Sequence, residues 1–285
     1  MMQFTALPFY RTSRSILPGY RLSIGVTLGW LVLIVLLPLG VLLGAFLSLP
    51  MDEIWRVATS PRVLAAFRVS IGAAFLAAVL ATIFGSIIAW VLVRYRFPGR
   101  DLFDALIDIP FALPTAIAGI ALSAIYAPDG WVGQFLHPLG IEIVFNRAGI
   151  VLALVFIGMP FVVRSLQPVI AEIDPEIEEA AASLGASKFQ ALMMVLMPQL
   201  LPAALSGFAL AFARGLGEYG SVIFLAGNVP MVSEIVPLTI VTALESYDMN
   251  AAIIIATMML ALAFALLYAL NRLQQWQGNK HKAIR

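Results

Sequence analysis

The sequence predicts an all-α polytopic membrane protein, and composition is the first reason. Of the 285 residues, 61% are hydrophobic and only 12% are charged, with a mean hydropathy of +0.97. Soluble domains carry about 25% charged residues, so this chain has too few charges for a surface that faces water. The chain has no cysteine, which excludes disulfides and thiolate metal sites.

Six long apolar stretches are the second reason, because a helix needs about 20 apolar residues to cross a bilayer. They cover residues 22–49, 64–93, 109–127, 149–169, 200–226 and 251–270. We therefore expect six transmembrane helices. The second and fifth stretches are longer than a span requires, which predicts tilt or extension past the bilayer. The first stretch lacks a small-residue cleavage site, so we expect it to be retained as a spanning helix.

Basic residues are concentrated in alternate connections between these stretches. The richer set is Arg11, Arg14, Arg21, Arg94, Arg96, Arg100, Lys188, Arg272, Lys280, Lys282 and Arg285. The other connections hold only Arg56, Arg62 and Arg147. The positive-inside rule then predicts that both termini and the loop at 171–198 are cytoplasmic.

We expect three parts along the chain. Residues 1–62 would form a cytoplasmic tail, the first transmembrane helix and a periplasmic loop. Residues 63–272 would form the core, with five transmembrane helices and the cytoplasmic loop 171–198. Residues 273–285 would form a second cytoplasmic tail, because this end is polar and basic.

The loop at 171–198 has the signals of two short helices joined by a tight turn. Asp174 is placed as an N-cap and Pro175 as the first helical residue, where proline has no hydrogen bond to lose. Gly185 is placed to end the first helix in a left-handed conformation. Ser187 and Gln190 form a capping box that starts the second helix.

The composition of this loop allows two interpretations. An amphipathic helix could lie on lipid headgroups, but such helices are usually rich in lysine and arginine. This loop instead carries five acidic residues between Glu172 and Glu179, which anionic lipid would repel. Its small residues also leave one surface thin, which suits insertion into a groove of another protein. The residues therefore favour docking to a protein partner.

A resemblance to a known family agrees with that interpretation. Glu179-Ala180-Ala181, then Gly185, then Val195-Leu196-Met197-Pro198 resembles the conserved cytoplasmic loop of ABC importer permeases, with Val195 and Met197 in place of the usual isoleucine and leucine. The resemblance implies the type I ABC importer permease fold, in which this loop seats in a cleft of an ATPase subunit. The docking residues that it implies are Glu178, Glu179, Ala180, Ala181, Gly185, Ala186, Ser187 and Phe189.

Four further segments resemble the sulfate/thiosulfate permeases of the CysT type. They are RYRFPGR at 94–100, DALIDIPFALPTAIAG at 104–119, PFVVRSLQPV at 160–169 and RGLGEYGSVIFLAGN at 214–228. The resemblance implies a second, related permease subunit in a heterodimer, two ATPase subunits that bind ATP and magnesium, and a periplasmic sulfate-binding protein. Permeases for molybdate share the Leu-Gly-Glu-aromatic-Gly pattern, so molybdate or tungstate remains an alternative substrate.

Two charged residues lie inside the fifth apolar stretch. Arg214 and Glu218 are four residues apart, and each such charge costs on the order of 3 kcal/mol at the centre of a bilayer on insertion scales. They could form a salt bridge that only fixes helix packing. Alternatively, Arg214 could line the translocation pathway and attract a divalent anion, with Glu218 beside it.

The start of the third apolar stretch offers further pathway candidates. Pro110 and Pro114 break helical hydrogen bonds, and such breaks are tolerated where a cavity is lined. With Thr115 they could present free N–H groups to an oxyanion. The alternative is a helix that starts late, with both prolines in its entry turn. Arg164 lies near a span end and is expected to extend its head group to the interface or to brace the cytoplasmic loop.

Enzymatic functions lack the residues that they need. His137 and His281 are far apart, and we expect no metal site or catalytic residue. The chain has no Gly-x-x-x-x-Gly-Lys-Ser/Thr loop, so we expect ATP hydrolysis to take place in separate chains. An ion-coupled secondary transporter is the competing class. It would need carboxylates at the membrane midplane, where Glu218 is the one clear candidate.

Overall fold

The computed structural model describes residues 19–282, and every regular element in that range is helical. Residues 1–18 and 283–285, which include Arg11, Arg14 and Arg285, lie outside the described range. The chain divides into two compact units, Met1–Leu49 and Pro50–Arg285. The division falls after Leu49, and helix α3 (Met51–Ala58) belongs to the second unit.

The first unit is one long apolar helix. It consists of α1 (Tyr20–Leu31), the π-helical η1 (Val32–Leu36) and α2 (Leu37–Leu47), which together form a candidate span over Leu22–Leu47. Its residues are almost all apolar over a length that can cross a bilayer, so this unit has the character of a membrane helix.

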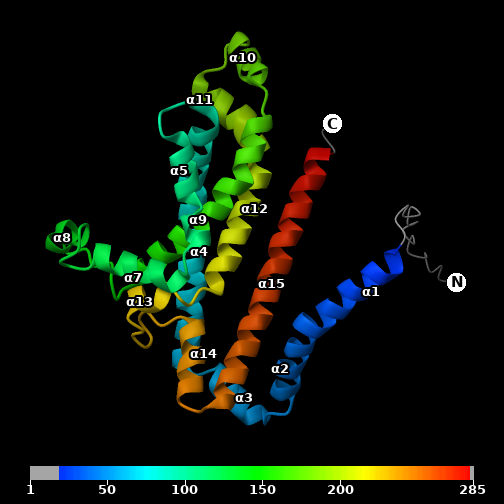
Figure 1. Cartoon of the computed structure of the whole chain (residues 1–285), viewed down its shortest axis with the longest axis vertical. Helices are drawn as coiled ribbons and strands as arrows, with labels where there is room; N and C mark the ends of the chain where they lie inside the picture. The colour runs from blue at the N-terminus through cyan, green and yellow to red at the C-terminus, as the bar shows by residue number, and fades with distance from the viewer. Residues whose placement is uncertain (1–18, 283–285) are drawn as a thin grey trace. The chain divides into compact units, whose positions relative to one another are not determined.

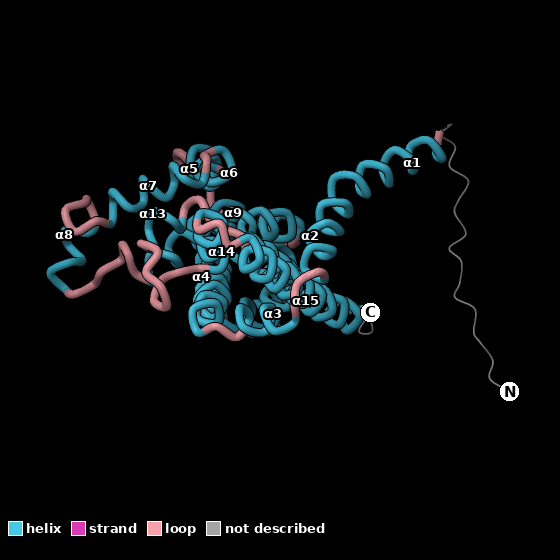
Figure 2. The backbone as a smooth tube through the Cα atoms, turned by 90° about the horizontal axis from the view of Figure 1, so that it is seen from below, coloured by secondary structure: helices cyan, strands magenta, loops and turns pink. Residues whose placement is uncertain are grey.

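Three long helices form the centre of the second unit. They are α4 (Pro61–Arg94), α9 (Arg147–Glu172) and α12 (Met197–Leu216), and α15 (Met249–Lys282) packs against α12 (Figures 1 and 2). Small residues let their backbones approach closely, because a Cβ added at Gly85 or Gly207 would press on Val162 of α9. The core consists of packed alanines and branched aliphatic side chains.

Shorter helices surround this centre. Helix α14 (Val236–Glu245) packs on α15, and α13 (Val222–Ala226) packs on α7 (Thr115–Tyr126). Helices α7 and α8 (Gly133–Leu136) project to the side away from α15 in both views, with the 3-10 turn η2 (His137–Leu139) next in the chain (Figures 1 and 2). Helices α5 (Arg100–Ile107) and α6 (Ile109–Ala112) join α4 to α7.

Within residues 19–282, five helices are long and apolar enough to cross a membrane, where six were expected. Four of the predicted spans are confirmed as helices: those at 22–49, 64–93, 149–169 and 251–270. The predicted third span, 109–127, is wrong as a single helix, because it divides into α6 and α7 at Leu113 and Pro114. Leu113 is extended, with φ −85° and ψ 137°, as expected before a proline.

The fifth predicted span also differs from its predicted bounds. Its helix begins at Lys188 and ends at Leu216, instead of covering 200–226. It begins early because α11 (Lys188–Gln190), the π-helical η3 (Ala191–Leu196) and α12 form one continuous helix. It ends early at the glycine-rich segment Gly217–Gly220, after which α13 starts separately. The short helix α14 was not predicted.

Candidate coupling loop and intramembrane polar site

The loop between α9 and α12 is capped as its sequence predicts. The Asp174 side chain accepts a hydrogen bond of 3.0 Å from the Glu176 N–H at the start of α10 (Pro175–Ser183). Gly185 is left-handed, with φ +85°, and terminates that helix. The Ser187 hydroxyl accepts from Gln190 N, and the Gln190 side chain accepts from Ser187 N at 2.8 Å, so the capping box is complete.

The end of this loop exposes large apolar side chains. Leu184 is 90% exposed, and Phe189 and Met194 are also largely exposed. Helix α10 lies at the end of the second unit, beyond the bundle, and packs chiefly on η3 (Figure 1). Because α10 itself is acidic and polar, this end has the properties of a surface for a protein partner rather than of a membrane segment.

The residues predicted to dock an ATPase do not all face outward. The exposed members are Glu179, Ala180, Gly185, Ser187 and Phe189, whereas Glu178, Ala181 and Ala186 are half-buried. Glu178 differs from its neighbour Glu179 because it faces the bundle, with Oε1 2.9 Å from Nη2 of Arg94 at the end of α4. The sequence did not identify this ion pair, since its two members are far apart in the chain.

The two charges inside the fifth apolar stretch form an ion pair. Arg214 Nη1 lies 2.6 Å from Glu218 Oε2. The Glu218 side chain is only 2% exposed, whereas that of Arg214 is 36% exposed. The other Glu218 oxygen accepts hydrogen bonds from the Ser221 N–H at 3.0 Å and from the Ser221 hydroxyl at 3.1 Å. Glu218 is therefore fully paired, and Arg214 is the more accessible partner.

The structure brings one of the proline-region candidates to the same place. Thr115, at the start of α7, is in close contact with Gly220, because a Cβ added to that glycine would overlap the Thr115 hydroxyl oxygen. Gly119 of α7 likewise packs directly on the Ser221 backbone. The start of α7 and the break after α12 are thus adjacent, although about a hundred residues separate them in the chain.

The two prolines are in different surroundings. Pro114 is exposed and caps α7, as the late-starting-helix alternative predicts. Pro110 lines an apolar groove with Phe103, Phe156, Met159 and residues of α4. No polar side chain lines this groove, so the Pro110 environment is unsuited to an anion. Of the five pathway candidates, Arg214, Glu218 and Thr115 therefore lie together, Pro114 directly precedes Thr115, and Pro110 lies apart in an apolar groove.

Arg164 holds α5 against α9. Its guanidinium contacts Asp108 through Nε at 2.9 Å and Nη2 at 2.6 Å, and Asp104 through Nη1 at 2.8 Å. Gln167 donates to the same Asp104 oxygen at 2.7 Å. Burial alone would raise the pKa of the Asp104 carboxyl, but the hydrogen bonds from Gln167 and Arg164 lower it below its ordinary value. Arg164 thus braces α5, not the cytoplasmic loop.

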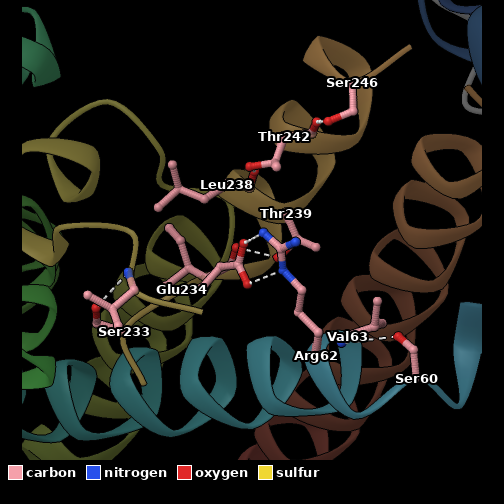
Figure 3. Close-up of polar contacts among 11 residues, drawn as sticks. Ser60, Arg62, Val63, Ser233, Glu234, Leu238, Thr239, Thr242 and Ser246 are labelled. Atoms are coloured by element: carbon pink, nitrogen blue, oxygen red, sulfur yellow. Dashed lines mark hydrogen bonds and ion pairs between the residues drawn. The ribbon is translucent and has the colours of Figure 1, made fainter. Parts of the chain in front are cut away.

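A further ion pair lies at the opposite end of the second unit from α10. In Figure 3, Arg62 at the start of α4 points toward Glu234, which precedes α14. The bond is bidentate, with Nε 2.8 Å and Nη2 2.6 Å from the two carboxylate oxygens. Glu234 is buried, and Ser70 of α4 also receives the Val236 N–H at 2.8 Å. These contacts join α14 to α4.

Sequence comparisons identify close relatives over nearly the whole chain. The family described as "Binding-protein-dependent transport system inner membrane component" matches residues 81–280. The sulfate transport system permease protein CysT of Salmonella typhimurium is 45% identical over 269 residues, covering 94% of this chain and 97% of the relative. The proteins of the same name from Escherichia coli and Synechocystis are 44% and 45% identical, covering 95% and 88% of this chain and 98% and 88% of the relatives.

Solved structures with the same fold are more distant in sequence. A bacterial ABC transporter involved in the import of the acidic polysaccharide alginate matches with a TM-score of 0.74 and 15% identity, covering 90% of this chain and 96% of that chain. The MetNI methionine ABC transporter, in an inward-facing conformation, matches with a TM-score of 0.55 and 15% identity, covering 80% of this chain and 99% of that chain. At this identity the comparison establishes the fold.

Proposed function

This chain belongs to the family of binding-protein-dependent transport system inner membrane components, and we propose that it is the permease subunit through which an ATP-driven importer moves sulfate or thiosulfate into the cytoplasm. The substrate rests on the relatives at 44–45% identity, which are sulfate transport system permease proteins. The alternative anions, molybdate and tungstate, would be taken by the same pathway.

The main observation in favour of an ATP-driven mechanism is the exposed apolar end of the 171–198 loop. Leu184 and Phe189 project into water on a rigid, doubly capped helix pair. Exposed apolar side chains on a rigid surface mark an interaction site, and we assign the partner as an ATPase subunit. ATP and magnesium would be bound by the ATPase chains, because this chain has no phosphate-binding loop.

The remaining partners are assigned to other surfaces. A second, related permease subunit would complete the translocation pathway, and two ATPase subunits would contact the loops of the two permeases. A soluble sulfate-binding protein would deliver the anion at the end of α3 and α14, opposite α10 (Figure 1). A solved alginate transporter of this fold is in complex with a periplasmic protein, which supports a periplasmic binding partner.

We assign the α10 end to the cytoplasm and the chain to the inner membrane. The basic residues near α10 and after α15 support this assignment under the positive-inside rule. The C-terminal part of α15 lies toward the same end of the second unit as α10, so one orientation accounts for both (Figure 1). By the same rule the N-terminus is cytoplasmic.

Within the membrane, Arg214 is our candidate for contact with the anion. Its guanidinium is partly exposed beside the break after α12, whereas Glu218 is buried and satisfied by Arg214 and Ser221. In a region of low dielectric, a positive charge lowers the cost of passing a divalent anion. Thr115 and the glycines at 217 and 220 would line the same point.

Uptake into membrane vesicles tests this function. The chain is co-expressed with its own second permease and ATPase, and uptake of labelled sulfate is measured with the binding protein outside and ATP inside. We expect ATP-dependent uptake that excess thiosulfate inhibits and molybdate inhibits weakly. A matched Leu184→Glu variant should lose both ATPase co-purification and uptake. Uptake that persists without ATP and follows an ion gradient would instead support the secondary-transporter alternative.

A further inference from the structure

Arg94 lies where α4, the end of α9 and the loop at 171–198, here called the coupling loop, meet. It is the last residue of α4, and its Nη2 lies 2.9 Å from Glu178 Oε1 on α10. The same nitrogen donates to the carbonyl oxygen of Ile173, which is the buried C-cap residue of α9, at 3.4 Å. The guanidinium also lies over the Trp90 ring, 5.2 Å from its centroid.

Each contact fixes Arg94 from a different direction. The Trp90 ring supports the guanidinium from its own helix through a cation–π contact. The Ile173 carbonyl binds it at the turn between α9 and α10. Its positive charge also suits the C-terminal end of α4, where the helix dipole is negative. The Arg94 side chain is only 19% exposed, and its guanidinium faces Glu178.

Helix α10 has few other connections to the membrane helices. It packs chiefly on η3, which lies after it in the chain, and it projects beyond the bundle (Figure 1). The Glu178–Arg94 pair is therefore a direct link from α10 to α4, and α4 is a central helix that contacts both α9 and α12. The adjacent Glu179 is exposed.

The pair is not fully hydrogen-bonded in this conformation. Arg94 Nε and Glu178 Oε1 are both buried without a hydrogen-bond partner, although Oε1 is within ion-pair distance of Nη2. An arginine can use Nε and Nη2 together in a bidentate bond to one carboxylate, as Arg62 does with Glu234. A small shift of α10 along α4 would let Arg94 form the same bidentate bond to Glu178.

We propose that Arg94 is a positioning residue that anchors the coupling helix α10 to the end of α4, and that the bond to Glu178 tightens when the ATPase displaces α10. This inference rests on the proposed function, because it assigns the ATPase as the source of the displacement. Glu178 then pairs with Arg94 of the same chain. Exposed residues such as Leu184 contact the ATPase instead.

The experiment compares Arg94→Gln, Glu178→Gln and the double variant in the purified transporter in vesicles. Matched controls are Arg96→Gln and Glu176→Gln, which neutralise exposed charges of the same sign on the same two segments. The readouts are ATPase co-purification and the number of sulfate ions moved per ATP hydrolysed. We expect either single variant to keep the ATPase bound and to lower sulfate moved per ATP about five- to tenfold, a typical size for a coupling interaction between sites.

The double variant distinguishes a pair from two separate roles. If Arg94 acts through Glu178, the double variant should be no worse than the Arg94→Gln variant, because the interaction is already lost. Arg94→Lys, which keeps the charge but cannot form a bidentate bond, should be intermediate. The anchoring role would be contradicted if the losses of sulfate moved per ATP in the two single variants added up in the double variant. It would also be contradicted if Arg94→Gln moved a normal amount of sulfate per ATP.

Limited proteolysis tests the anchor without transport. Lys188 is an exposed trypsin site immediately after the turn that follows α10. In detergent-solubilised chain, trypsin should cut after Lys188 several-fold faster in Arg94→Gln than in wild type or Arg96→Gln, because α10 is released from α4. An unchanged rate would overturn the anchor even if the wild type moved no sulfate. Absence of sulfate uptake by wild type, with faster cleavage in the variant, would count against the proposed function alone.

Discussion

Glu218 is bound on one oxygen by Arg214, at 2.6 Å, and on the other by Ser221, whose N–H and hydroxyl both donate to it. The carboxylate thus bridges the end of α12 and the start of α13 across the glycine-rich break. Its burial makes the arginine necessary, because an unpaired buried carboxylate is strongly destabilising. Arg214 can therefore have a packing role, as the partner of Glu218, and a separate role in contact with the anion, and variants can distinguish the two.

Arg214→Gln alone should reduce assembly of the permease, because it leaves Glu218 buried with only its Ser221 bonds. The expected cost is about 3 kcal/mol, the lower end for removing one partner of a buried ion pair. Adding Glu218→Gln should restore assembly, since the amide oxygen can still accept from Ser221. Sulfate uptake per assembled complex should remain low in the double variant if Arg214 serves the anion. Full uptake there would leave Arg214 with a packing role only.

Gly185→Val should weaken ATPase binding and sulfate uptake while leaving membrane insertion intact. The residue has φ +85° and open space around it, so the cost arises from the backbone, at about 1 kcal/mol or more. Gly185→Asn is the matched control, because asparagine tolerates the left-handed conformation and should lose less. Measurements are co-purified ATPase and uptake. Equal behaviour of the two variants would contradict a backbone-based effect.

Arg164→Gln should release α5 from α9 by removing the bonds to Asp104 and Asp108. Each such bond to a charged group is worth on the order of 1–3 kcal/mol, so thermal stability in detergent should fall measurably. Arg68→Gln, at an exposed arginine of α4, is the control and should change stability little. Proteolysis at Arg100, at the start of α5, should also accelerate in Arg164→Gln. Unchanged stability would show that α5 is held by its apolar contacts.

The orientation of the chain can be tested with single cysteines, since the native sequence has none. Leu184 and Met249 are both exposed, and they follow α10 and begin α15 at opposite ends of the second unit (Figure 1). In intact spheroplasts an impermeant thiol reagent should label Met249→Cys and not Leu184→Cys. Permeabilised cells should label both, which controls for reactivity. The reverse pattern in intact spheroplasts would contradict a cytoplasmic coupling loop.

Local signals in the sequence were sufficient for the two capped helices of the loop at 171–198 and for four membrane helices. The Asp174 cap, the left-handed Gly185 and the Ser187–Gln190 box depend on residues within a few positions of each other, so pattern alone predicts them. The Arg214–Glu218 pair is likewise local, at i,i+4. Long uninterrupted apolar runs predicted spans for the same reason.

Contacts between distant segments were decided only by the tertiary structure. The hydropathy of residues 109–127 predicted one span. Pro114 instead holds the backbone of the preceding Leu113 in an extended conformation, which divides this stretch into α6 and α7. The Arg94–Glu178 and Arg62–Glu234 pairs join elements far apart in the chain, and charge patterning in one sequence does not show which opposite charges meet. The same holds for burial, because Glu178 is half-buried beside Arg94 of α4 whereas its neighbour Glu179 is exposed.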